Sequence, residues 1–368
     1  MILVPKRHFY FKKYIIFKFK IMSKNILITG VTGQDGSNMV RYLLQNTIHQ
    51  IFGSIRLVSV SNFDNIQDIC DPRFQLITMD LTDQQSIFNI VKKIKPDYII
   101  NFAAQSRVSE SWNSPIVTFT SNTLPILYFL EAIREINPQC RFYSAGSSEE
   151  FGEVNYSPQD IHHPMKPKST YGASKCAARA LVKVYRESYN LFAIHCILFN
   201  HEGIRRGKQF VTRKITSTIA RIQKELKEGK IIQPLELGNI NVVRDWSDSE
   251  DFVEAVWLML TQKEPKEYVL SSDETHSVKE FLELSCEYAG LQVTWEYGGS
   301  EVETKLWCQG QIIMKINPDL YRPTEVDLLC GDSKETRKIL GWSPKTNFKQ
   351  LVKKMMDWDI QLFSSKKY

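Results

Sequence analysis

The sequence predicts an α/β protein of the Rossmann type, with a doubly wound parallel sheet and a smaller C-terminal α/β substrate-binding domain. Two observations support this prediction. Short apolar stretches alternate with amphipathic segments over about 180 residues, which is typical of repeated βαβ units. The first unit contains a glycine-rich turn, and the chain beyond residue 200 is less regular. We therefore expect a dinucleotide-binding domain over residues 22–200 and a second domain over 201–368 that is partly interleaved with the first.

The glycine-rich turn separates an apolar strand from an amphipathic helix. Its three glycines have the spacing G-x-x-G-x-x-G, which differs from the G-x-G-x-x-G of many dinucleotide sites. Glycines at these positions allow a tight turn and a close backbone approach, so that a pyrophosphate can lie at the helix N-terminus. We expect the turn to bind a nicotinamide dinucleotide through Gly30, Thr32, Gly33, Gln34, Asp35 and Gly36.

The ends of the following strands supply further candidate cofactor residues. Arg56 ends the second strand, at the point where an enzyme specific for NAD usually places an acid. A guanidinium there suits a 2′-phosphate, so the sequence favours NADP, although NAD remains possible. The alternative is a solvated arginine. Later strands end beside the same crevice at Asp80, Leu81, Ala103, Ala104 and Ser106.

Two segments carry residue types suited to catalysis. The apolar stretch 140–145 is predicted to be a buried strand, and Ser147 and Glu149 follow it. Tyr171 and Lys175 lie four residues apart at the start of a predicted helix and therefore share one face. Because a nearby ammonium favours the phenolate, we expect Lys175 to lower the pKa of Tyr171, which would then accept a proton from an alcohol. The same spacing is common on solvated helix faces.

Composition limits the kind of partner. The chain has 368 residues, 43% of them apolar, which is typical of a globular protein. Its net charge is +6, and residues 1–21 carry six basic and no acidic residues, so the remainder is neutral. A neutral remainder argues against a nucleic-acid partner.

Residues 1–21 and the cysteines bear on the compartment. The apolar runs of 1–21 are too short for a membrane span, and we expect a disordered extension, with a weak membrane-surface anchor as the alternative. The seven cysteines are scattered without a C-x-x-C motif, which indicates reduced thiols and a cytoplasmic location. The sequence predicts no metal site.

These motifs together resemble the extended short-chain dehydrogenase/reductases, most of which act on nucleotide sugars. The resemblance is carried by TGVTGQDG, by SSE after the fifth strand and by YGASK. Longer segments at 198–216, 237–260, 272–291 and 321–332 resemble the GDP-mannose 4,6-dehydratase family, over nearly the whole chain from Met22. The resemblance implies NADP as cofactor, GDP-mannose as substrate, a homodimer or homotetramer, and a downstream GDP-sugar reductase or epimerase.

The resemblance also implies catalytic roles. Tyr171 would deprotonate the C4 hydroxyl of the sugar, and Lys175 would lower the pKa of Tyr171 and hold the nicotinamide ribose. Ser147 would hydrogen-bond the C4 oxygen. Glu149 would remove the C5 proton, which the 4-ketone acidifies, and help to expel the C6 hydroxyl as water. The product would be GDP-4-dehydro-6-deoxymannose, with the cofactor regenerated.

Binding residues follow from the same resemblance. His201 and Arg206 would lie near the nicotinamide or its phosphates. The residues that would hold GDP are Asn200, Lys214, Arg244, Arg322 and Glu325. Cations suit a pyrophosphate, and a carboxylate can accept from the N–H groups of guanine. Without the resemblance, Arg244 would be predicted to form a surface ion pair with Asp245 or Asp248.

The chain departs from the family's pattern at four positions. Ser147 replaces a threonine, and Gly146 and Glu150 depart from a commoner ASTSE-aliphatic run. Because side chains alternate along a strand, we expect Glu150 to point away from Glu149. Leu57 stands where a second arginine is usual, which weakens the expectations of NADP and of a tetramer.

Two other functions remain open at this point. A GDP-4-keto-6-deoxymannose reductase, or another epimerase or dehydratase of the same family, would share Tyr171 and Lys175, and a reductase would not need Glu149. A non-catalytic dinucleotide-binding protein is the more remote alternative. In the C-terminal part we expect a two-strand region near 291–317, with segment 296–314 capping the substrate cleft.

Overall fold

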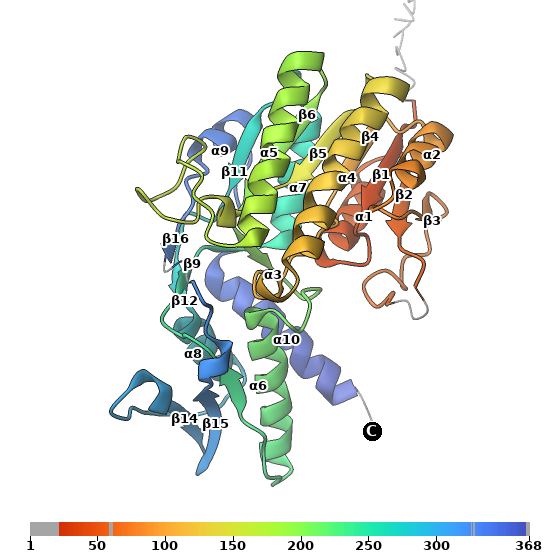
Figure 1. Cartoon of the computed structure of the whole chain (residues 1–368). Coiled ribbons are helices and arrows are strands. Elements are labelled where there is room, and N and C mark those ends of the chain that lie inside the picture. The colour runs from red at the N-terminus through yellow and green to blue at the C-terminus, as the bar shows by residue number, and fades with distance from the viewer. Residues whose placement is uncertain (1–21, 59–61, 325, 327, 366–368) are drawn as a thin grey trace, which may run out of the picture.

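A seven-stranded parallel sheet forms the centre of the structure, a computed structural model that describes residues 22–58, 62–324, 326 and 328–365. The strand order is β11-β6-β5-β4-β1-β2-β3 (Figure 1). The strands are β1 (Asn25–Thr29), β2 (Gln50–Ile55), β3 (Phe74–Thr78), β4 (Tyr98–Asn101), β5 (Arg141–Ala145), β6 (Ala193–Leu198) and β11 (Glu267–Leu270). The chain winds outward in both directions from β1 and β4, which confirms the predicted doubly wound fold. In such sheets ligands bind where the order reverses, at the carboxyl ends of the strands.

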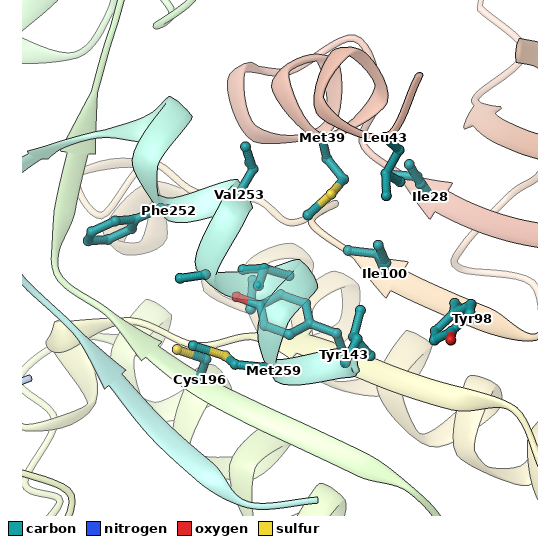
Figure 2. Packing of buried hydrophobic residues seen from close by; sticks show 14 of the residues in the cluster. Ile28, Met39, Leu43, Tyr98, Ile100, Tyr143, Cys196, Phe252, Val253 and Met259 are labelled. Atoms are coloured by element: carbon teal, nitrogen blue, oxygen red, sulfur yellow. The ribbon is translucent and has the colours of Figure 1, made fainter. Parts of the chain in front are cut away.

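Helices cover both faces of this sheet. One layer contains α1 (Gln34–Asn46), α7 (Ser249–Leu260) and α9 (Lys334–Leu340), and the other contains α2 (Gln84–Ile94), α4 (Pro115–Ile136) and α5 (Thr170–Tyr189). The short helix α3 (Glu110–Asn113) packs against α4 and α5. Figure 2 shows Met39 of α1 facing Val253 of α7, with Leu43 beside Ile28 of β1 and Met259 beside Cys196 of β6. Burying each such side chain contributes about 1.5–3 kcal/mol. The chain beyond residue 200 thus returns to the large sheet as α7, β11 and α9.

Helix α4 is long and apolar. Among the described residues, it alone has the length and composition to cross a membrane, with a mean hydropathy of 1.3 over its most apolar stretch. Half of that stretch is buried inside the protein, and Phe129, Leu130 and Ile133 belong to the core beneath α2 and α5. A core helix of this kind passes the same test, so the finding is weak evidence for a membrane span.

The remaining elements form a smaller unit with its own core, drawn below the sheet in Figure 1. Helices α6 (Val211–Lys227), α8 (Val278–Tyr288) and α10 (Phe348–Ser365) pack against a four-stranded sheet in the order β13-β14-β15-β8. Its strands are β8 (Leu235–Leu237), β13 (Thr294–Glu296), β14 (Lys305–Cys308) and β15 (Gln311–Ile316). Strand β14 was not predicted; it lies between β13 and β15 and pairs antiparallel with both.

Short strand pairs connect the two units. The parallel pair is β7 (Asn200–Glu202) with β10 (Trp246–Asp248), and the three-stranded group is β9 (Val243–Arg244), β12 (His276–Ser277) and β16 (Leu328–Leu329). The expectation for residues 1–21 lies outside the described residues.

Candidate active site

One cavity of about 1630 Å³ extends from the carboxyl ends of the large sheet into the smaller unit. All predicted site residues that the structure describes line it: Gly30, Thr32, Gly33, Gln34, Asp35, Gly36, Arg56, Asp80, Leu81, Ala103, Ala104, Ser106, Ser147, Glu149, Tyr171, Lys175, Asn200, His201, Arg206, Lys214, Arg244 and Arg322. Glu325 lies outside the described residues. The expectation that 296–314 caps the cleft is wrong, because these residues form β14 and its neighbours and are not among the described residues that line the cavity.

The glycine turn is tight, and its backbone can approach a pyrophosphate closely because Gly30 and Gly36 carry no side chains. Gly30 has a φ of +70°, and a Cβ on Gly36 would lie 2.3 Å from the Gly30 carbonyl oxygen. The Gly33 N–H donates to the same oxygen at 2.9 Å. Thr29 Oγ1 accepts from the Ala103 N–H at 3.0 Å, which fixes the turn against the end of β4. Helix α1 therefore begins at the cavity wall with its N-terminal N–H groups available to an anion.

A charged pair joins this turn to β7. His201 Nε2 lies 3.0 Å from Asp35 Oδ2, and His201 Nδ1 lies 2.8 Å from the Phe199 carbonyl oxygen. Burial acts to raise the pKa of Asp35, but the charge and hydrogen bond of His201, with Arg206, hold it below its usual value. Burial acts to lower the pKa of His201, yet Asp35 outweighs it and the pKa is raised. Both residues were predicted to contact the cofactor, and their mutual contact was not foreseen.

The four predicted catalytic residues come from the end of β5 and the start of α5. Strand β5 ends at Ala145, and the 3₁₀ turn η1 (Ser148–Glu150) follows Ser147. Ser169 caps α5 by accepting from the Gly172 N–H at 3.0 Å, which aims Tyr171 and Lys175 at the same end of the sheet.

The expected effect of Lys175 on Tyr171 is not present in this structure. Lys175 Nζ donates to the Ala145 carbonyl oxygen at 2.7 Å and lies 5.8 Å from the centre of the Tyr171 ring. Burial raises the pKa of Tyr171 to about 12, with Glu149 acting in the same direction, although a hydrogen bond from Ser147 lowers it. Burial also lowers the pKa of Lys175 to about 8. Desolvation is therefore the largest influence on the pKa of both groups.

The two adjacent glutamates point in different directions. Glu149 lines the cavity, with its carboxylate 3.5 Å from Arg322 Nη1. Glu150 points into the protein interior, where it meets His195. The divergence was predicted from strand alternation, but that reason is wrong, because both glutamates lie in the 3₁₀ turn η1 and not in a strand. Arg322, predicted to bind GDP, instead contacts the predicted proton acceptor here.

The far end of the cavity is lined by polar and cationic groups. Lys214 of α6 donates from Nζ to the Glu236 carbonyl oxygen at 2.6 Å. Arg244 of β9 is buried and donates from Nη1 to its neighbour's carbonyl oxygen. The alternative of a surface ion pair for Arg244 is wrong, because Arg244, Asp245 and Asp248 are all buried. Asn200, on β7, also lines the cavity.

The structure adds cationic residues that were not predicted. Arg107, Arg205 and Lys208 also line the cavity. Arg205 and Lys208 belong to the IRRGK run that contains Arg206, so their neighbourhood was a usable signal. Arg107 lies in an irregular loop, and no comparable signal in the sequence pointed to it. Within the described ranges there is no group of three or more His, Cys, Asp or Glu side chains that could hold a metal ion.

The parallel sheet, the glycine turn and the Ser-Tyr-Lys set at β5 and α5 define an extended short-chain dehydrogenase/reductase. Solved structures agree in fold. Superposition on a dTDP-glucose 4,6-dehydratase from Bacillus anthracis in complex with NAD gives a TM-score of 0.75 at 20% identity, covering 94% of this chain and 99% of that one. RMD from Pseudomonas aeruginosa complexed with NADPH gives 0.70 at 22% identity, covering 93% and 99%.

Sequence relatives define the family more narrowly. The sequence profile described as GDP-mannose 4,6 dehydratase matches residues 27–355. GDP-mannose 4,6 dehydratase of Drosophila melanogaster is 40% identical over 348 residues, covering 92% of this chain and 87% of that protein. The Homo sapiens protein of that name is 38% identical over 346 residues, covering 91% of each. The chain therefore belongs to the GDP-mannose 4,6-dehydratase family, as its motifs predicted.

Proposed function

We propose that this protein is a GDP-mannose 4,6-dehydratase that converts GDP-α-D-mannose to GDP-4-dehydro-6-deoxy-D-mannose and water, with NADP as its cofactor. The observation that carries the proposal is the meeting of Ser147, Glu149, Tyr171 and Lys175 at one cavity wall, in a chain of this family. A carboxylate beside the Tyr and Lys pair provides a base for the elimination step. A reductase would not need this group.

The residues present fit a nicotinamide dinucleotide. When bound, the cofactor accepts a hydride from C4 of the sugar and returns it at C6. The turn at Gly30–Gly36 leaves backbone N–H groups for the pyrophosphate. Arg56 follows β2 at the cavity wall, where a guanidinium suits the 2′-phosphate of NADP.

The protein side chains move the protons. Tyr171 takes the proton of the C4 hydroxyl, and Ser147, already within hydrogen-bonding reach of Tyr171, donates to the C4 oxygen. Glu149 takes the C5 proton and passes it to the departing C6 hydroxyl, which leaves as water. The proton held by Tyr171 then returns to C5, so the protons balance and no external reductant is consumed.

The substrate end of the site has cationic and polar side chains that suit GDP. Lys214, Arg244 and Arg322 provide fixed positive charge for the GDP pyrophosphate, and Asn200 provides neutral polar groups. Glu325 is proposed to accept from the guanine. Arg322 contacts Glu149 in this structure, so GDP binding would draw Arg322 toward phosphate and release the carboxylate for proton transfer.

Domain roles, location and assembly are further parts of the proposal. Residues 22–200 would bind mainly NADP, and residues 201–368 mainly the GDP-sugar. All seven cysteines are free thiols, which supports a reducing, cytoplasmic setting. The family resemblance supports a homodimer or homotetramer and a downstream reductase or epimerase.

The test is incubation of the purified protein with GDP-mannose and a catalytic amount of NADP, followed by mass spectrometry of the sugar nucleotide. Loss of one water without added NADPH is the expected result. Dehydration of a UDP- or dTDP-sugar in place of GDP-mannose would contradict the assigned substrate. Dehydration of no nucleotide sugar, with stoichiometric use of NADPH on a 4-keto sugar, would favour the reductase.

A further inference from the structure

A buried hydrogen-bonded pair lies beneath the catalytic turn and has no assigned role. The side chains of Glu150 and His195 are completely buried, and His195 Nε2 lies 3.0 Å from Glu150 Oε1. His195 stands on β6 opposite Ser144 of β5, and its Nδ1 lies 3.3 Å from Ser144 Oγ. Because a carboxylate only accepts, His195 Nε2 carries the hydrogen. Both ring nitrogens therefore have partners, and the imidazole is a fixed support for Glu150.

Glu150 uses the same oxygen to hold the catalytic turn. Its Oε1 accepts from the Ser147 backbone N–H at 2.8 Å, and Ser147 Oγ accepts from the Glu149 N–H at 3.3 Å. The two side chains form a reciprocal capping box around η1. Glu150 thus fixes the backbone of the two residues that are proposed to hydrogen-bond the C4 oxygen and to remove the C5 proton.

Gly146 makes room for this arrangement. A Cβ at this position would lie 2.4 Å from His195 Nε2 and 2.6 Å from Glu150 Oε1. Gly146 and Glu150 are both positions at which the turn departs from the pattern described above. An aliphatic side chain at 150 could not accept from Ser147, whose N–H would need another partner. The two departures are therefore physically linked through His195.

The charge of Glu150 also affects the pKa values of the catalytic residues, although Glu150 is not among the described residues that line the cavity. Burial lowers the pKa of Lys175, and Glu150 counteracts this by favouring the ammonium form. The same charge acts to raise the pKa of Tyr171. Glu150 therefore influences both residues without contacting substrate.

We propose that Glu150, supported by His195, is a positioning residue of this active site, whose hydrogen bond to the Ser147 backbone holds Ser147 and Glu149 toward the cavity. This inference rests on the proposed dehydratase function. It assigns to Glu150 a role in kcat rather than in substrate binding, because displacement of reacting groups by about 1 Å can lower a rate about 100-fold.

The experiment compares Glu150→Leu, which removes the acceptor, with Glu150→Gln, which keeps an oxygen of the same reach. Glu150→Asp retains the charge but is one methylene shorter, and replaces the leucine variant if that variant does not fold. Glu153→Gln is the control, since Glu153 is exposed and pairs with Lys166. Each variant is assayed for kcat and KM with GDP-mannose, and hydrogen–deuterium exchange is followed in the peptide spanning 145–151.

In Glu150→Leu, kcat should fall about 100-fold with KM changed less than about threefold, and the peptide should exchange faster. Glu150→Gln should have a kcat at least tenfold higher than that of Glu150→Leu, and its 145–151 peptide should again be protected from exchange. The proposal is overturned if Glu150→Leu keeps wild-type kcat, if glutamine rescues nothing, or if exchange in this peptide is unchanged. An inactive wild type would defeat the dehydratase function alone, because the exchange comparison still decides the positioning role.

Discussion

Replacing Asp359 tests the buried ion pair that joins α10 to α6. Asp359 is fully buried, and Arg213 of α6 contacts it with Nε at 3.0 Å from Oδ2 and Nη2 at 2.9 Å from Oδ1. Thr216 Oγ1 donates to the same carboxylate at 2.7 Å. Arg213 also donates to the Ile204 carbonyl oxygen, next to the arginines that line the cavity.

The magnitude follows from what the substitution leaves behind. In Asp359→Ala the Arg213 guanidinium stays buried with one carbonyl partner, and breaking a buried ion pair in this way costs about 3–5 kcal/mol. Burial already acts to lower the pKa of Arg213, which Asp359 opposes. Removing both partners in Arg213→Met/Asp359→Leu takes away the isolated charge as well. That double variant should be at least about 2 kcal/mol more stable than Asp359→Ala.

The assay is equilibrium urea unfolding followed by far-ultraviolet circular dichroism, with Lys353→Met as the control because Lys353 forms an exposed pair on the same helix. Exposed pairs contribute about 0–1 kcal/mol. A free energy of unfolding for Asp359→Ala within about 1 kcal/mol of wild type would refute the argument. So would a double variant whose loss of stability equals the sum of the losses in Arg213→Met and in Asp359→Leu, since the pair would then show no coupling.

Three further predictions concern the active site. Glu149→Gln should lower kcat about 10²–10⁴-fold and prevent uptake of solvent deuterium at C5 of the sugar, measured by mass spectrometry. The control Glu153→Gln should keep the wild-type kcat and the wild-type deuterium uptake. Deuterium uptake at the wild-type rate in Glu149→Gln would exclude Glu149 as the base. Arg56→Ala should weaken NADP binding by about tenfold or more in calorimetry and leave NAD binding nearly unchanged, and an equal loss for both would remove Arg56 from the 2′-phosphate site. Burial lowers the pKa of Lys175 to about 8, so its ammonium is present below that pH and is lost above it. The value of kcat/KM should therefore fall as the pH rises through about 8. In Lys175→Arg, which stays charged, this alkaline fall in kcat/KM should move to higher pH. A limb that stays in place would assign it to another group.

Local pattern was sufficient for the large sheet. Apolar runs that alternate with amphipathic segments predicted the repeated βαβ units of this sheet, and the strand predicted over 140–145 corresponds to β5 (Arg141–Ala145). The glycine turn could also be predicted from the sequence, because a Cβ at residue 36 would clash with the backbone of Gly30 and only glycine fits there. Strand β14 was missed because its four residues alternate weakly and gain their stability from partners on both sides.

The sequence by itself determined the fold class, the family and the residue types at the catalytic centre, since these depend on periodicity and on motifs that are contiguous in the chain. Only the tertiary structure decided their electrostatics and partners. Burial, which no local pattern reports, raises the pKa of Tyr171, against the expected direction, and lowers the pKa of Lys175, for which no direction was predicted. The pairings of Glu149 with Arg322 and of Glu150 with His195 join segments 173 and 45 residues apart. The second contact exists only once β5 and β6 have paired in the sheet, and the first only once the chain around residue 322 has packed against the end of that sheet.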